Sequence, residues 1–204
     1  MAEFSVAILC LAGWVFAASA AMKLRSRWAY SSFRDGLRET GLVPGRLLPS
    51  IAAVLCWVEV AVAAGLLGAA ALTAVAVSGA VPFAESVLGV AAGLTGVLAV
   101  GVAVVIRRGA HARCACFGAG SSRPLGRAHL ARNLSLMAVV CAGLAAVPQP
   151  HPHPILVGTL MAAAVGGVTA LLFIRWDDVA DLLAPIRQPT AGARDTRQES
   201  RDDD

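Results

Sequence analysis

Five long runs of apolar residues, separated by polar segments, dominate the amino-acid sequence. The runs extend from Phe4 to Met22, Leu47 to about Ala70, Ser86 to Ile106, Leu134 to Val147 and Ile155 to Ile174. A helix needs roughly 20 apolar residues to cross the hydrocarbon core of a bilayer. The pattern therefore predicts an all-α fold, a polytopic bundle of about five transmembrane helices.

The sequence leaves two boundaries of these spans open. The fourth run is short, and its helix begins nearer Leu130 if Arg132 extends its side chain to the lipid head groups. From Leu47 to Val81 the only charged residue is Glu59. The second run is therefore either one long tilted helix or a helix followed by an apolar turn that ends at Pro82.

Basic residues alternate with the spans. Lys and Arg gather in the first and third loops and in the C-terminal segment, whereas the N-terminus and the second and fourth loops carry none. The first loop holds Lys23, Arg25, Arg27, Arg34, Arg38 and Arg46, and the third holds Arg107, Arg108, Arg113, Arg123 and Arg127. Because basic loops stay on the cytoplasmic side of a membrane, we predict the N-terminus outside and the C-terminus inside.

The composition argues against a soluble protein, since 57% of the residues are hydrophobic and only 15% are charged. The net charge of +4 is divided among loops that flank helices, so we expect membrane lipid and no nucleic acid as a partner. We interpret residues 1–180 as one integral domain of the inner (plasma) membrane. Residues 181–204 are expected to form a disordered cytoplasmic tail, because the chain after Pro185 consists largely of Arg, Asp, Gln and Ser and contains few apolar residues.

The first loop contains aromatic residues among its charges. Trp28, Tyr30 and Phe33 alternate with basic and polar positions, which is typical of an amphipathic segment at the membrane interface. Gly41 and Pro44 are expected to end this segment.

Small residues are frequent in the spans. Gly89 and Gly93 lie four residues apart, a spacing that lets the backbones of two transmembrane helices approach closely. The composition predicts a compact single bundle.

The segment Arg113-Cys114-Ala115-Cys116-Phe117-Gly118 follows the third span. A disulfide between Cys114 and Cys116 would close a tight, strained ring that exchanges readily. Neighbouring arginines favour the thiolate form that attacks disulfides. The two cysteines are therefore a candidate redox pair, although they could equally be small loop residues without chemistry.

A metal site is a weaker interpretation of the same segment. His111, Cys114, Cys116 and His129 supply two sulfur and two nitrogen ligands of the kind that zinc prefers. The first three are too crowded for the usual finger spacing, and we predict no metal. Cys10, Cys56 and Cys141 lie inside spans, where cysteine usually behaves as a small hydrophobic residue.

Glu59 lies about halfway along the second predicted span. A carboxylate inside a membrane is costly and is a candidate functional group. No Lys or Arg is predicted at its depth, so we expect Glu59 to be protonated or hydrogen-bonded to a polar group such as Ser19 or Thr95. It is either a proton or quinone site or a hydrogen bond that holds the bundle together.

Taken together, these motifs resemble the methylamine-utilisation protein MauE family, within the wider DoxX-like group of membrane proteins. The resemblance rests on Gly13 and Ala21–Leu24, on Gly41–Pro44, Glu59 and Gly65–Leu67, and on Cys114–Gly118, Pro124–Arg127 and Arg132–Leu134. It covers roughly residues 5 to 147. The family usually has Gly between the two cysteines, where this chain has Ala115.

The resemblance implies a membrane component that assists maturation of the disulfide-rich light subunit of methylamine dehydrogenase, beside a thioredoxin-like partner. Cys114 and Cys116 would be the redox pair of a thiol-disulfide oxidoreductase-like protein, and Glu59 the intramembrane acid. No cofactor is certain, although a quinone is a candidate acceptor of electrons. The alternative is a non-catalytic membrane scaffold or assembly factor in which the cysteines are incidental.

The two lines of inference conflict over the location of the cysteine loop. The charge rule places it in the cytoplasm, where thiols are kept reduced, whereas disulfide formation in an exported enzyme takes place outside. Either the loop relays reducing equivalents from the inside, or its arginines belong to a reactive site and mislead the charge count.

Overall fold

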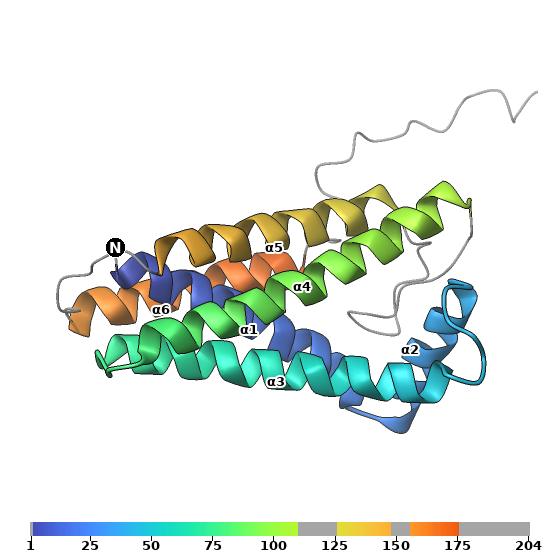
Figure 1. Cartoon of the computed structure of the whole chain (residues 1–204), viewed down its shortest axis with the longest axis horizontal. Coiled ribbons are helices and arrows are strands. Elements are labelled where there is room, and N and C mark those ends of the chain that lie inside the picture. The colour runs from blue at the N-terminus through green and yellow to red at the C-terminus, as the bar shows by residue number, and fades with distance from the viewer. Residues whose placement is uncertain (1, 110–125, 148–155, 176–204) are drawn as a thin grey trace, which may run out of the picture.

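The computed structural model describes residues 2–109, 126–147 and 156–175. This part of the chain forms six helices (Figure 1): α1 (Ala2–Leu24), α2 (Arg27–Glu39), α3 (Leu48–Ala74), α4 (Ala80–Arg107), α5 (Arg127–Ala146) and α6 (Leu156–Ile174). All of these except α2 are long and apolar enough to cross a membrane. The prediction of an all-α bundle with five spans is confirmed, and the chain is a multi-pass membrane protein. The predicted redox pair Cys114 and Cys116 and the predicted tail lie outside the described residues.

The turn between α3 and α4 resolves the uncertain end of the second span. α3 ends at Ala74 and α4 begins at Ala80, so the long apolar run is a helix followed by an apolar turn. The backbone turns at Ala76 and Gly79, whose φ angles are +54° and +93°. Pro82 lies in the first turn of α4, where a missing N–H costs no hydrogen bond.

α5 begins earlier than the sequence predicts. It starts at Arg127 rather than near Leu130 or Leu134, and Arg132 is buried, with 8% of its surface exposed. The position of Arg132 relative to the lipid head groups stays a prediction. Its side chain faces the interior of the bundle, where a polar residue need not extend to the interface.

α1 is the central helix of the bundle. It packs mainly against α3 and α6, and also against α5 and α2, while α4 joins α3 to α5 (Figure 1). Within its membrane-spanning window α1 is 67% buried, against 22% to 33% for the other four spans. A helix surrounded by others is apolar on all sides, as the sequence of α1 is.

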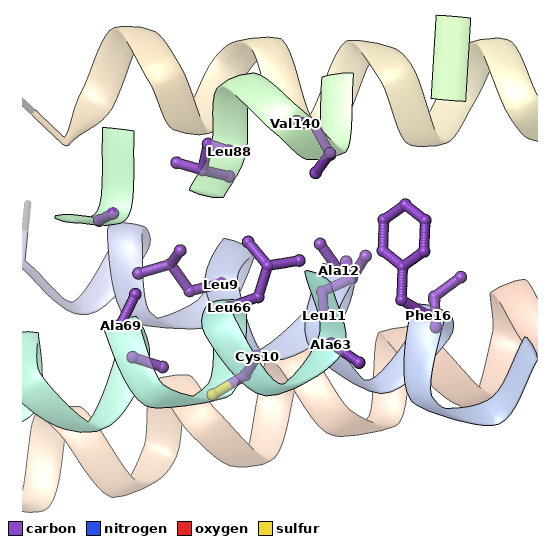
Figure 2. Close-up of a cluster of buried hydrophobic side chains, with 14 of the residues drawn as sticks. Leu9, Cys10, Leu11, Ala12, Phe16, Ala63, Leu66, Ala69, Leu88 and Val140 are labelled. Atoms are coloured by element: carbon purple, nitrogen blue, oxygen red, sulfur yellow. The ribbon is translucent and has the colours of Figure 1, made fainter. Parts of the chain in front are cut away.

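All five spans contribute buried residues to the main core. Leu9 of α1, Leu66 of α3, Leu88 of α4 and Val140 of α5 point toward one another in Figure 2, and each is fully buried. Large apolar side chains such as Trp57 cover the outer surface. An apolar exterior of this kind suits the surrounding lipid.

Close packing of the backbones depends on glycines other than the predicted pair. A Cβ atom on Gly166 of α6 would collide with the carbonyl oxygen of Ala7 in α1, and a Cβ on Gly143 would lie 2.8 Å from a side-chain carbon of Ile8. Around Gly89 and Gly93, in contrast, no atom lies within 4 Å of such a Cβ, and both residues are exposed. The prediction that these two glycines allow close packing is wrong within this chain.

α2 is the predicted amphipathic segment. Its first turn is capped by Ser26, whose hydroxyl oxygen accepts a hydrogen bond from the backbone N–H of Ala29 at 3.0 Å. Phe33 is buried against α3, whereas Trp28 is 61% exposed. The helix ends before Gly41, which has a φ angle of +64°. α2 lies across the end of the bundle where α1 ends and α3 begins (Figure 1).

We predict that Gly166→Ala destabilises the bundle, whereas Gly167→Ala does not. The added methyl group at position 166 forces α6 away from α1, while position 167 has open space. The expected loss for Gly166→Ala is about 1–3 kcal/mol, as for other overpacked sites. Reversible unfolding in mixed micelles with an increasing fraction of SDS measures both variants. Equal stability of the two would show that α1 and α6 do not pack as described.

Candidate functional site

Lys23 and Glu59 form an ion pair inside the bundle. The Lys23 ammonium donates to Glu59 Oε1 at 2.5 Å and to Oε2 at 2.6 Å. Each residue is only 2% exposed. The pair joins the end of α1 to the first half of α3, so two charges that would be costly alone neutralise each other.

Ser19 completes the pair. Lys23 donates a further hydrogen bond to the Ser19 hydroxyl oxygen at 3.1 Å, and Ser19 donates to Glu59 Oε2 at 3.2 Å. The predicted hydrogen bond between Ser19 and Glu59 is thus confirmed. Thr95, the other predicted partner, instead donates to the carbonyl oxygen of Ala91 at 2.7 Å.

The expectation that no Lys or Arg shares the depth of Glu59 is wrong. Lys23 was assigned to the first loop because it follows the apolar run, but α1 continues to Leu24. Side chains in an α-helix point back toward its N-terminus. The ammonium group therefore lies alongside Ser19, one turn deeper than the lysine backbone.

α2 covers the ion pair from the end of the bundle. The Lys23 ammonium lies 4.8 Å from the centre of the Phe33 ring, a distance suited to a cation–π interaction. Phe33 also packs with Ala52 and Cys56 of α3. The amphipathic helix thus places Phe33 of its apolar face against the ion pair.

A cavity of about 70 Å³ adjoins the ion pair. Its polar lining residues come from four spans, and its apolar lining residues come from α1, α4, α5 and α6. The polar residues are Ser19, Lys23, Glu59, Thr95, His129, Arg132 and Asn133, and the apolar residues are Val15, Phe16, Leu98, Val102, Leu136 and Phe173. A cavity of this volume, lined by several polar groups, has room for water molecules.

The first two turns of α5 provide polar groups that the sequence analysis did not combine. His129, Arg132 and Asn133 have the spacing that places side chains on one face of a helix, and all three line the cavity. His129 was considered only as a zinc ligand, with three residues that lie outside the described part of the chain. Within the described residues, no group of three or more metal-ligating side chains is close enough to hold a metal ion.

The cysteines of the described spans do not line the cavity beside the ion pair. Cys10 belongs to the main core and Cys56 packs beneath α2, both in apolar surroundings. Cys141 is exposed on the outer face of α5. Their interpretation as small hydrophobic residues is consistent with these positions. Cys114 and Cys116 lie outside the described residues, between Gly109 after α4 and Gly126 before α5.

The family model described as "Methylamine utilisation protein MauE" matches residues 1–147. The chain belongs to the MauE family. The match spans α1 to α5, and it includes every described residue that lines the cavity except Phe173 of α6. A search of curated proteins and a search of solved structures each returned no match.

We predict that breaking the ion pair of this MauE-family protein is costly and that replacing both partners is not. Lys23→Met or Glu59→Leu alone leaves a buried polar or charged group and should cost about 3–5 kcal/mol of unfolding free energy. The double variant should recover most of this loss, because an apolar pair leaves no buried charge.

The same mixed-micelle unfolding experiment provides the double-mutant cycle for the pair. Arg38→Gln, on the exposed face of α2, is the control and should change stability by no more than about 0.5 kcal/mol. Strictly additive losses in the double variant would mean that Lys23 and Glu59 do not interact.

Proposed function

We propose that this MauE-family membrane protein supports thiol-disulfide exchange during maturation of a disulfide-containing partner enzyme. In the type case of the family resemblance, that partner is the light subunit of methylamine dehydrogenase. The family match over residues 1–147 carries the proposal, because it includes both the Cys114–Cys116 segment and the buried Lys23–Glu59 site. The proposed location is the inner (plasma) membrane, with a thioredoxin-like protein as a second partner.

The proposed chemistry needs only thiols and disulfides. The thiolate of one cysteine attacks a disulfide of the partner and forms a mixed disulfide, and the second cysteine then displaces the partner's sulfur as a thiolate. The partner gains two electrons and becomes a dithiol, while Cys114 and Cys116 become a disulfide. The reverse sequence oxidises the partner, and a thioredoxin-like protein restores the starting state.

The exposed arginines at the end of α4 support the reactive form of the cysteines. Arg107 and Arg108 precede the Cys114–Cys116 segment, and both are exposed. Positive charge close to a cysteine lowers the free energy of its thiolate relative to its thiol. The Lys23–Glu59 pair supports the proposal by giving the bundle a fixed structure. It holds α1 and α3 together, and Phe33 of α2 packs against its ammonium group.

The described cavity beside Glu59 is smaller than a cavity that encloses a benzene ring. A cavity that holds a benzene ring has a volume of about 150 Å³, whereas the cavity beside Glu59 has about 70 Å³. We therefore propose that electrons pass through protein thiols.

A non-catalytic assembly factor is the second candidate function. The observation that favours it is the extent of the structural network, since one ion pair with Ser19 and Phe33 connects α1, α2 and α3. In that case the membrane bundle would present a docking surface, and its cysteines would not change oxidation state.

We predict that Cys114→Ser and Cys116→Ser each abolish the redox function while the protein still inserts and accumulates. In cells that make the partner enzyme, alkylation of free thiols followed by gel electrophoresis reports the disulfides of that enzyme. Cys141→Ser, on the lipid-facing side of α5, should leave them unchanged. Normal disulfides in the partner of the Cys114→Ser/Cys116→Ser double variant would favour the assembly factor.

We further predict from the charge rule that the cysteine segment faces the cytoplasm. A membrane-impermeant maleimide should then label Cys114 and Cys116 in inverted membrane vesicles and leave them unlabelled in intact cells. Labelling in intact cells only after reduction would instead place a disulfide outside, and would support direct oxidation of an exported partner.

A further inference from the structure

We propose that one face of α2 binds the head groups of anionic phospholipids. Arg27, Arg34 and Arg38 are separated by seven and four residues, a spacing that places them on the same side of a helix. These three residues are called the arginine stripe below. The inference concerns the surface of α2, and it does not depend on thiol chemistry.

The acidic residues of α2 form a separate row. Asp35 and Glu39 follow Trp28 by seven and eleven residues, so this row has the same spacing as the arginine stripe and begins one residue later. One residue corresponds to about 100° around the helix axis. Opposite charges are thus separated around the helix, and the arginine stripe presents charges of one sign.

The side chains of the arginine stripe are available to a ligand. Arg27 and Arg38 are exposed, and Arg34 is partly exposed. Among the residues that the structure describes, no ion pair joins any of the three to an acidic side chain. A guanidinium group keeps its charge at neutral pH, and its planar set of N–H donors matches the oxygens of a phosphate group.

The place of α2 in the chain keeps the arginine stripe close to the membrane surface. α2 begins three residues after the last residue of α1, and it lies across the end of the bundle (Figure 1). The helices on either side of it in the chain, α1 and α3, are both candidate membrane spans. The head groups of the surrounding lipids lie at the ends of such spans, within reach of the arginines.

Exposed apolar side chains next to the arginines favour a lipid over a soluble anion. Trp28 is 61% exposed and Leu24 is 43% exposed, close in sequence to Arg27. Tryptophan is enriched where membrane meets water, and a basic amphipathic helix is typical of binding to a membrane surface. A phosphate ion in water would leave these apolar side chains without a partner. We therefore assign the arginine stripe to phospholipid head groups.

The contact between α2 and the ion pair is compatible with lipid binding. Phe33, whose ring centre lies 4.8 Å from the Lys23 ammonium, is about 100–140° around the helix axis from the arginine stripe. α2 can therefore hold Phe33 against the ion pair and bind head groups at the same time. Lipid bound to this docked helix would stabilise the folded protein.

Thermal unfolding of the full-length protein in neutral dodecylmaltoside micelles tests the proposal, with dioleoylphosphatidylglycerol as the probe. A ligand that binds only the folded state raises the unfolding midpoint in a saturable way. We expect saturable stabilisation by this lipid. Dioleoylphosphatidylcholine has the same acyl chains but no net charge, and should have a much smaller effect.

The variant Arg27→Gln/Arg34→Gln/Arg38→Gln removes the charge of the arginine stripe. Its phosphatidylglycerol concentration at half-saturation should rise roughly fivefold for each arginine removed, or on the order of 100-fold for all three. The matched control Arg107→Gln/Arg108→Gln/Arg127→Gln removes three exposed arginines elsewhere and should bind the lipid like the unmodified protein. An equal loss in the two triple variants would overturn the proposal.

Two further measurements complete the experiment. Equal stabilisation of the unmodified protein by the two lipids would contradict the proposal even if the glutamine variant does not fold. Sodium phosphate, compared with sodium chloride at the same ionic strength, should give no saturable stabilisation. If it does, and the effect is lost in Arg27→Gln/Arg34→Gln/Arg38→Gln, the arginine stripe binds a soluble phosphate and the assignment to lipid is wrong.

Discussion

The Lys23–Glu59 ion pair places a strict geometric demand on the bundle, because neither charge is stable alone in an apolar interior. α1 must extend to its last turn as a regular helix for the lysine to reach back to Ser19 and Glu59. α3 must be placed so that its carboxylate meets the ammonium, and α2 must bend across the end so that Phe33 covers it. Three helices thus meet at one ammonium group and the carboxylate, hydroxyl and aromatic ring around it, whereas Leu9 and Leu66 belong to the larger apolar core.

The transmembrane helices could be predicted because contact with lipid requires long stretches of apolar residues, which are easily recognised in a sequence. Each span needs a long apolar stretch, so the number of spans and the approximate ends of α1, α3 and α6 follow from hydropathy. The amphipathic character of α2 was also predictable, since Trp28 and Phe33 are interleaved with basic residues. The direction in which the bundle crosses the membrane still depends on the charge rule alone.

The interior site could not be predicted in the same way, since hydropathy treats a polar residue as the end of a span. Lys23 was therefore placed in a loop, and His129 was placed before its helix rather than inside it. Within this bundle, polar side chains face one another and a cavity instead of lipid. The glycines illustrate a related limit, because the spacing of Gly89 and Gly93 permits close packing but does not show which face of α4 meets another helix.

The central position of α1 has a consequence for biogenesis. α1 precedes the other described helices in the chain, yet it is the one that they surround. During synthesis it enters the membrane before any of its neighbours, and its lysine must remain near the aqueous boundary until Glu59 arrives on α3. α1 would then take its final place between the other helices only when the ion pair forms. α6 also packs against α1 and contributes Phe173 to the cavity wall, and it follows the other described helices in the chain.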